Sequence, residues 1–338
     1  MKTPQKLFVF LFLCSSYGLL ANGLPSGYVV GWGYNPVFGC DGVNYNNQTS
    51  TGVVTIAGRV LDDVIAISAG DSHSLALKRD GTVAGWGIGL AGQSTGSTVR
   101  IDHTNGLVAI KGQQLKNITA IAAGSAHSLA LKSDGIVVAW GDPFGGATAV
   151  PDGLSNVVAI AAGGEHSLAV RVDGSVVGWG MTKVPDSFTN IVMVTAAESW
   201  KADDFALTRD GTVIRWNGRN SRVSEPVPGL SNVVAIASGT TAFQGDHHLA
   251  LLKNGTVKGW GYVSEVPEGL SNVVSIAAAA MHSLALKSDG TVVAWGKIGF
   301  QPVIVPEGLS NIVAIAAGPN FCLAITTNRA VAEKFFQK

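Results

Sequence analysis

Histidine recurs at one place in most repeats of this chain, at the start of a short apolar run of the form His-Ser-Leu-Ala. The residues are His73, His127, His166, His282, and His247 or His248. A ring of histidines around one channel would suggest a metal, but metal ligands must converge at about 2 Å from one ion. Equivalent positions on different sheets lie too far apart for that. We therefore expect each ring to form a hydrogen bond with a neighbouring strand, and we predict no metal and no cofactor.

Groups that could do covalent chemistry are sparse. Gly92-Gln93-Ser94-Thr95-Gly96 matches Gly-x-Ser-x-Gly, but a nucleophilic serine of that kind needs a strand–turn–helix context. This segment lies in a stretch rich in Gly, Ser and Thr. We interpret the acidic pairs Asp62-Asp63 and Asp203-Asp204 as solvated turns. The sequence thus predicts no catalytic residue and no enzyme.

The first residues have the pattern of a secretory signal. Lys2 and Lys6 precede the apolar run Leu7–Cys14, and Ala21-Asn22-Gly23 offers small residues for cleavage. The run is too short to span a bilayer, and no other segment looks transmembrane. We expect residues 1–23 to be a signal peptide and the mature protein to be secreted or periplasmic.

Bulk composition narrows the classes of partner. Of the 338 residues 46% are hydrophobic and 14% charged, and Lys+Arg and Asp+Glu both number 23. Without a basic run, neither nucleic-acid binding nor polybasic membrane binding is expected. Forty-three glycines with little helical periodicity indicate many turns and an all-β fold.

Tryptophan marks the repeat, at intervals of 35 to 54 residues. The residues are Trp32, Trp86, Trp140, Trp179, Trp216, Trp260 and Trp295. We expect these seven to pack between sheets, and periods of this size indicate a solenoid or a propeller. Each repeat predicts one four-stranded antiparallel sheet. Strand A lies around Val-Pro at the outer edge, B is of the type VVAIAA, C of the type HSLAL and D of the type VVAWG. Asp-Gly pairs between C and D predict type I′ hairpins.

The two ends of the chain are complementary. Gly27–Gly33 is a strand D without a preceding A, B or C, whereas the last repeat, from Val303, ends after its strand C. Pairing of these parts predicts a closed, seven-bladed β-propeller over residues 24–327, followed by a C-terminal tail, 328–338. The tail could form an amphipathic helix or begin a linker.

The repeat AGxxHSLALxxDGxVxxWG resembles that of the regulator of chromosome condensation family. The residues that carry it include Gly124, His127, Ser128, Leu129, Asp134, Gly135, Trp140 and Gly141. The resemblance implies a seven-bladed propeller, and eukaryotic members act as nucleotide exchange factors or bind chromatin. This chain differs in its export signal, the lack of a basic tail and only a trace, Ala91-Gly92-Gln93, of the family's NxxGQLG. We therefore do not expect exchange activity.

The compact spelling WG…VP…VVAIAAG resembles exported bacterial members more closely, among them propeller-type β-lactamase inhibitors. Those proteins carry aromatic residues at or before the His position of successive blades. The matching residues here are Ser72, Ala126, Glu165 and Met281. None of them is aromatic, so the circle of aromatic side chains found in those inhibitors is missing.

Loop length suggests a binding face. Turns B–C and connections D–A share one face, here called the lower face, and nearly all insertions fall on it; turns A–B and C–D share the upper face. Variable loops on a rigid scaffold are where binding usually occurs. The aromatic residues predicted to bind a ligand are Trp200, Phe243, Tyr34, Phe38 and Tyr45. The alternative is that these loops have drifted without a function.

Cysteine usage fits an oxidising compartment. Once the signal is removed only Cys40 and Cys322 remain, and ring closure brings both toward the lower face. We expect a disulfide that locks the closing blade, against the alternative of two free thiols.

We thus expect an exported, monomeric, non-catalytic β-propeller that binds a protein or a glycan, with no nucleic acid and no membrane as partner. The alternatives are a secreted inhibitor of an extracellular enzyme such as a β-lactamase, and a carbohydrate-active enzyme.

Overall fold

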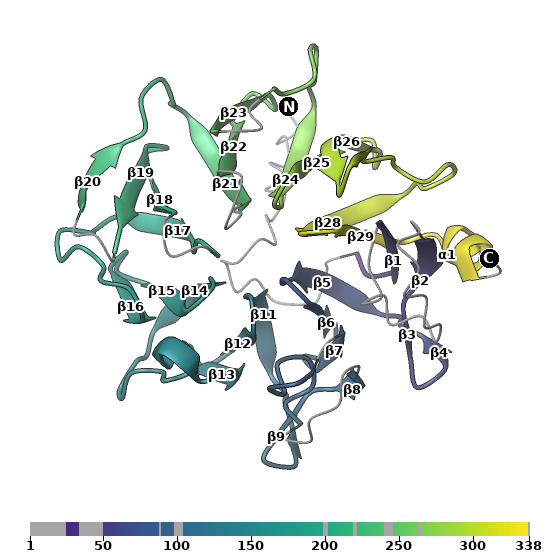
Figure 1. Cartoon of the computed structure of the whole chain (residues 1–338), viewed down its shortest axis with the longest axis horizontal. Coiled ribbons are helices and arrows are strands. Elements are labelled where there is room, and N and C mark those ends of the chain that lie inside the picture. The colour runs from purple at the N-terminus through teal and green to yellow at the C-terminus, as the bar shows by residue number, and fades with distance from the viewer. Residues whose placement is uncertain are drawn as a thin grey trace, which may run out of the picture.

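The computed structural model describes residues 25–33, 50–87, 89–97, 104–198, 202–218, 222–239, 246–261 and 265–336. Seven sheets stand like blades around a central axis (Figure 1). The all-β, seven-bladed propeller expected from the repeat is therefore confirmed. None of the helices in these ranges is long and apolar enough to cross a membrane.

The blades are numbered along the chain. Blade 1 contains β5 (Val64–Ala69), β6 (His73–Lys78), β7 (Val83–Gly87) and β8 (Thr104–Leu107). Blade 2 contains β11 (Ile118–Ala123), β12 (His127–Lys132) and β13 (Val137–Gly141), and blade 3 contains β14 (Val157–Ala162), β15 (His166–Arg171) and β16 (Val176–Gly180). Blade 4 contains β17 (Ile191–Thr195), β18 (Asp204–Thr208), β19 (Val213–Asn217) and β20 (Arg222–Pro226).

Blade 5 contains β21 (Val233–Gly239), β22 (His247–Leu252) and β23 (Val257–Gly261). Blade 6 contains β24 (Val273–Ala278), β25 (His282–Lys287), β26 (Val292–Ile298) and β27 (Gln301–Pro302). Blade 7 contains β28 (Ile312–Gly318), β29 (Phe321–Thr326), β1 (Tyr28–Gly33) and β2 (Ser50–Val53). The remaining elements are the hairpins β3 (Thr55–Ile56)–β4 (Arg59–Val60) and β9 (Ala109–Ile110)–β10 (Gln113–Gln114), a 3-10 turn η1 (Phe144–Gly146) and the helix α1 (Arg329–Phe336).

The outer strand differs from the expectation in two ways. Strand A does not belong to the sheet of its own repeat, because it pairs with strand D of the preceding one, as when Val227 N donates to Val213 O (2.8 Å). Among the described residues it forms a ladder strand in blades 1, 4, 6 and 7, whereas the sheets of blades 2, 3 and 5 have three strands there. In blade 3 only Met181, Thr182 and Lys183 separate strand D from the Val-Pro pair, which leaves no room for a further ladder strand.

The ring closes as expected. Strand β1 pairs with β29 from Tyr28↔Thr326 to Gly33↔Phe321, and β2 then pairs with β1. In Figure 1 the purple β1 lies beside the yellow end of the chain. The tail forms a helix, α1, whose buried Ala332 and Phe335 face this blade.

The C–D turns differ in type from the expected I′. In the turn after β6, Gly81 N donates to Lys78 O (3.0 Å) and Lys78 N donates to Thr82 O (2.9 Å). Of the two central residues only Gly81 has a positive φ, 77°. This is a three-residue loop with a glycine bulge. The carboxylate of Asp80 fixes it by accepting from N and Oγ1 of Thr82 (2.9 and 2.6 Å).

The upper face is tied together between blades. Ile118 N donates to Gly81 O (3.0 Å), and the equivalent bond recurs from Val157 N to Gly135 O (3.2 Å). The residue before each inner strand adopts left-handed backbone, which asparagine tolerates better than most residues. These residues are Asp63, Asn117, Asn156, Asn190, Asn232, Asn272 and Asn311.

The core is a series of apolar layers between neighbouring blades. In one layer Leu129 and Leu131 of blade 2 pack against Ile160 and Trp179 of blade 3. In the next, Leu168 packs against Trp216 of blade 4. Each such side chain contributes about 1.5–3 kcal/mol on burial. The repeat tryptophans lie in these layers, as the sequence predicted.

Candidate functional site

The strand-C histidines link five of the seven blades to the next blade along the chain. Nε2 of His73 lies 2.7 Å from Oγ of Ser128, and Nε2 of His127 lies 2.9 Å from Oγ of Ser167. The same geometry joins His247 to Ser283 (3.0 Å). The predicted hydrogen bond to a neighbouring strand is therefore confirmed, with the Ser of the next His-Ser pair as partner.

Other residues replace the serine in two of these links. His166 Nε2 lies 3.0 Å from Oδ1 of Asp204, and His282 Nε2 lies 3.3 Å from Sγ of Cys322. In blade 5 the serine position is held by His248, whose ring packs against Phe205 at 4.3 Å between centroids.

Burial keeps five of the histidine rings neutral. It lowers the pKa of His127, His247 and His282 from 6.5 to about 4, and that of His73 and His248 to about 3. Among the described residues no three His, Cys, Asp or Glu side chains are grouped to hold a metal ion.

The D–A connections cap these links from the lower face. The carbonyl of Gln93 accepts from Ser128 Oγ (2.8 Å) and from Trp140 Nε1 (2.9 Å). In blade 3 the carbonyl of Ala147 accepts in the same way from Ser167 Oγ (2.9 Å) and Trp179 Nε1 (2.8 Å). Ser94 of the Gly-x-Ser-x-Gly segment lies next to Gln93, in the D–A connection after blade 1, and is fully buried.

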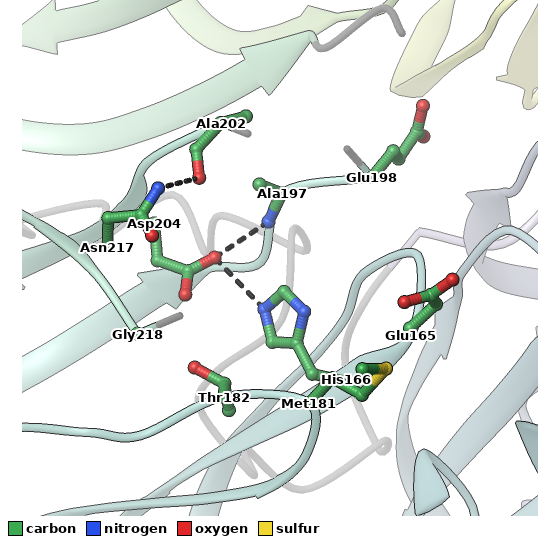
Figure 2. A pocket seen from close by; sticks show the side chains of 10 residues that line it. All are labelled: Glu165, His166, Met181, Thr182, Ala197, Glu198, Ala202, Asp204, Asn217 and Gly218. Atoms are coloured by element: carbon green, nitrogen blue, oxygen red, sulfur yellow. Dashed lines mark hydrogen bonds and ion pairs between the residues drawn. The ribbon is translucent and has the colours of Figure 1, made fainter. Parts of the chain in front are cut away.

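A pocket opens on the lower face between blades 3 and 4, with the His166–Asp204 pair at its floor (Figure 2). Oδ1 of Asp204 also accepts from Ala197 N (2.9 Å). The carboxylates of Glu165 and Glu198 point away from this pair (Figure 2). The prediction that Asp203-Asp204 is a solvated turn is wrong for Asp204, which is buried in β18 because this carboxylate replaces the serine of the interblade link.

Asp62 and Asp63 meet the expectation of exposed acidic residues. Asp62 lies 3.3 Å from Lys78 Nζ and Asp63 lies 3.2 Å from Arg79 Nε, both on the upper face. Surface pairs of this kind contribute little to stability, about 0–1 kcal/mol.

Glu198 lies where three hollows meet. It lines the pocket of Figure 2, a cavity between blades 2 and 3, and the central channel. The channel is otherwise lined by small and β-branched residues of the inner strands, such as Ala122 and Val194. Burial, the charge of Asp71 and a hydrogen bond to Asp71 raise the pKa of Glu198 well above its usual value. The hydrogen bond between Glu198 and Asp71 connects the B–C turns of blades 1 and 4.

Four exposed apolar side chains lie on separate D–A connections of the lower face. Phe300 is 95% exposed and Phe144 is 66% exposed, and Leu90 and Met181 are exposed on two further connections. Sequence reasoning did not find these four residues. Their place in the lower-face connections was the available signal, because exposure itself depends on the packed structure.

The residues predicted to bind a ligand, Trp200, Phe243, Tyr34, Phe38 and Tyr45, lie outside the described residues. The same holds for Cys40 and for the predicted signal peptide, 1–23. Cys322 is described: it is buried, it is bonded to no other described cysteine, and burial raises the pKa of its thiol well above the usual value. A bridge between Cys40 and Cys322 stays a prediction.

Comparisons with known proteins agree with the fold. The model of the regulator of chromosome condensation (RCC1) repeat matches residues 64–93, 118–146 and 157–182. Protein pim1 of Schizosaccharomyces pombe is 28% identical over 208 residues, which cover 60% of this chain and 28% of pim1. Protein RCC1 of Candida albicans is 31% identical over 133 residues, covering 33% of this chain and 27% of that protein.

Both matches span little more than a quarter of those proteins. Among solved structures, yeast RCC1 (Prp20) bound to Kap60 has a TM-score of 0.66 at 18% identity, over 92% of each chain. That likeness shows the fold alone. The expected likeness to exported bacterial members stays a prediction.

Proposed function

We propose that this chain, an RCC1-repeat β-propeller, is an exported, non-catalytic module that binds a protein partner on its lower face. The observation that carries the proposal is the exposure of Phe144 and Phe300 on connections of that face. Burying such a ring at an interface contributes about 1.5–3 kcal/mol. Aromatic anchors of this kind dominate many protein–protein interfaces.

The scaffold beneath these side chains supports a binding role. Phe300 projects from the tight turn between β26 and β27, and Phe144 begins η1 directly after blade 2. Both are held by strands that are paired within a closed ring, so presenting them to a partner costs little ordering entropy. The upper face also exposes Ile136 and Val172, but its turns are short and are bonded to the next blade.

The buried position of Ser94 and the use of the strand-C histidines in interblade bonds favour a non-catalytic role. Export rests on the pattern of residues 1–23. We assign no function to this chain from its eukaryotic relatives, because the matches cover only about a quarter of the length of pim1 and of RCC1.

The test is capture of binding proteins from the growth medium of the source cells, with the purified mature protein on a solid support. We expect a specific set of captured proteins, identified by mass spectrometry, that is lost with the double variant Phe144→Ala/Phe300→Ala. The matched control is Ile136→Ala/Val172→Ala on the upper face, which should retain the set. Equal capture by both variants would reject the lower face as the binding surface. Capture abolished by periodate treatment of the medium would assign the partner as a glycan instead.

An inhibitory role makes a different prediction. If the partner is an enzyme such as a β-lactamase, addition of the purified protein lowers its activity in proportion to the amount captured. Unchanged activity of the captured enzyme would leave a binding module without inhibition.

A further inference from the structure

A cavity of about 300 Å³ opens on the lower face between blades 2 and 3. It is far larger than the roughly 30 Å³ share of one liquid water molecule. We propose that it receives the guanidinium group of an arginine from the protein partner. This inference rests on the proposed function and names the chemistry that the partner brings.

The charge of the cavity wall favours a cation. Asp142, Glu165 and Glu198 line it, and no lysine or arginine does so among the described residues. Asp142 accepts one hydrogen bond, from Phe144 N (2.9 Å), which leaves its second oxygen for a ligand. Because the raised pKa of Glu198 favours its neutral form, the negative charge that faces a ligand comes mainly from Asp142 and Glu165.

His127 offers an unused acceptor in the same wall. Oγ of Ser167 gives its one proton to the Ala147 carbonyl (2.9 Å), so it must accept from Nε2–H of His127 (2.9 Å). This places the proton on Nε2 and leaves a lone pair on Nδ1, which no described residue engages. The ring is 1% exposed and lines the cavity. The Nδ1 atoms of His73, His247 and His282 are without a partner in the same way, but of the strand-C histidines only His127 lines this cavity, where its acceptor can meet a donor ligand.

Phe144 suits an arginine in particular. Its ring lies at the rim of the cavity and is two-thirds exposed. A planar guanidinium stacks on an aromatic face and forms paired hydrogen bonds with a carboxylate, whereas an ammonium does neither as well. The aliphatic stem of the arginine would cover the apolar surface of Phe144 and Ala126.

The test uses three peptides: acetyl-Gly-Arg-Gly-amide, the same peptide with citrulline, and the same peptide with lysine. Citrulline keeps the shape of arginine but replaces the cation with a neutral urea. Binding to the mature protein is measured by calorimetry and by NMR titration at pH 7 and low salt. We expect the arginine peptide to bind at least tenfold more tightly than the citrulline peptide and more tightly than the lysine peptide.

Glu165→Gln and Asp142→Asn should each weaken binding of the arginine peptide at least fivefold, and Phe144→Leu about threefold. The control is Glu268→Gln, in an exposed turn outside the lower face. Thermal melts check that each variant is folded. If one of the two carboxylate variants does not fold, the other still tests the inference. Equal binding of the arginine and citrulline peptides, or full binding by both carboxylate variants, overturns the inference.

The two proposals fail separately. If Phe144→Ala/Phe300→Ala abolishes capture of the partner but Glu165→Gln and Asp142→Asn do not, the lower face binds a partner without an arginine in this cavity. If none of these variants alters capture, the proposed function itself falls.

Discussion

Nε2 of His127 lies 2.9 Å from Oγ of Ser167, across the boundary between blades 2 and 3. Both residues come from the same two-residue phrase, His-Ser, in successive repeats. The histidine of one phrase donates, and the serine of the next phrase accepts and passes its own proton to a connection on the lower face. One sequence motif thus supplies both halves of this link and of the one from His73 to Ser128, and repetition alone aligns them.

The first prediction concerns the energy of that link. His127→Ala and Ser167→Ala should each lower the free energy of unfolding by about 1–3 kcal/mol, because either change leaves a buried polar group without its partner. The double variant should lose less than the sum, with a coupling on the order of 1 kcal/mol. Urea unfolding measures all three. His127→Ala combined with Ser283→Ala, in the distant blade 6, should be additive, and coupling of equal size in that pair would contradict a direct bond.

The second prediction concerns pH. The five histidines with lowered pKa are neutral in the fold, at values of about 3 to 4, but take up protons near 6.5 when unfolded. Their stabilisation is complete above pH 6.5 and is lost as pH falls toward 3, and each can contribute on the order of 3–5 kcal/mol. Glu198 acts in the opposite sense. Because its pKa is raised in the fold, it stabilises the folded state most at pH values below the usual pKa of a glutamate, and this stabilisation is lost as the pH rises.

Because five histidines outweigh one glutamate, the urea concentration at the midpoint of unfolding should fall steadily as the pH is lowered from 7 to 4.5. His282→Gln should reduce the slope by about one proton. A midpoint that stays constant over this range would show that the histidines remain accessible to protons in the fold.

The third prediction concerns closure of the ring. Strand β1 contributes Val29, Val30 and Trp32 to the core. Burial of each contributes about 1.5–3 kcal/mol, and total stabilities are only about 5–15 kcal/mol. A chain that begins at residue 50 should therefore lack a cooperative thermal transition. A chain that ends at residue 328 loses only α1 and should melt cooperatively at a lower temperature. Equal melting of both truncated chains would refute closure by β1.

The fourth prediction concerns the left-handed asparagines. Asn156 has φ of 57° and an exposed side chain. Asn156→Ala should cost about 1 kcal/mol, because Cβ crowds the backbone in this conformation. Asn156→Gly should be nearly neutral. Urea unfolding of both variants checks this, and the opposite ranking would mean that the asparagine side chain itself stabilises the turn.

Repetition made most of the fold predictable, because the period, the order of strands B, C and D and the ring closure can all be derived from recurring phrases, whereas the blade to which strand A belongs was predicted wrongly. The type of the C–D turns was not predictable, since the side chain of Asp80 bonding to Thr82 favours a different loop from the one that Asp-Gly suggests alone. The burial of Asp204 was missed because it depends on His166 of the neighbouring blade. Phe144 and Phe300 were missed because exposure is a property of the packed molecule.

The shared blade has a consequence for synthesis on the ribosome. Strand β1 is made first, yet its partner β29 ends at residue 326 of 338. The edge of β1 that pairs with β29 must therefore stay unpaired until nearly the whole chain has emerged from the ribosome. A chain rearranged to begin at β17, with residues 326 and 28 joined by a short linker, would complete that blade midway through translation and should fold with less dependence on chaperones.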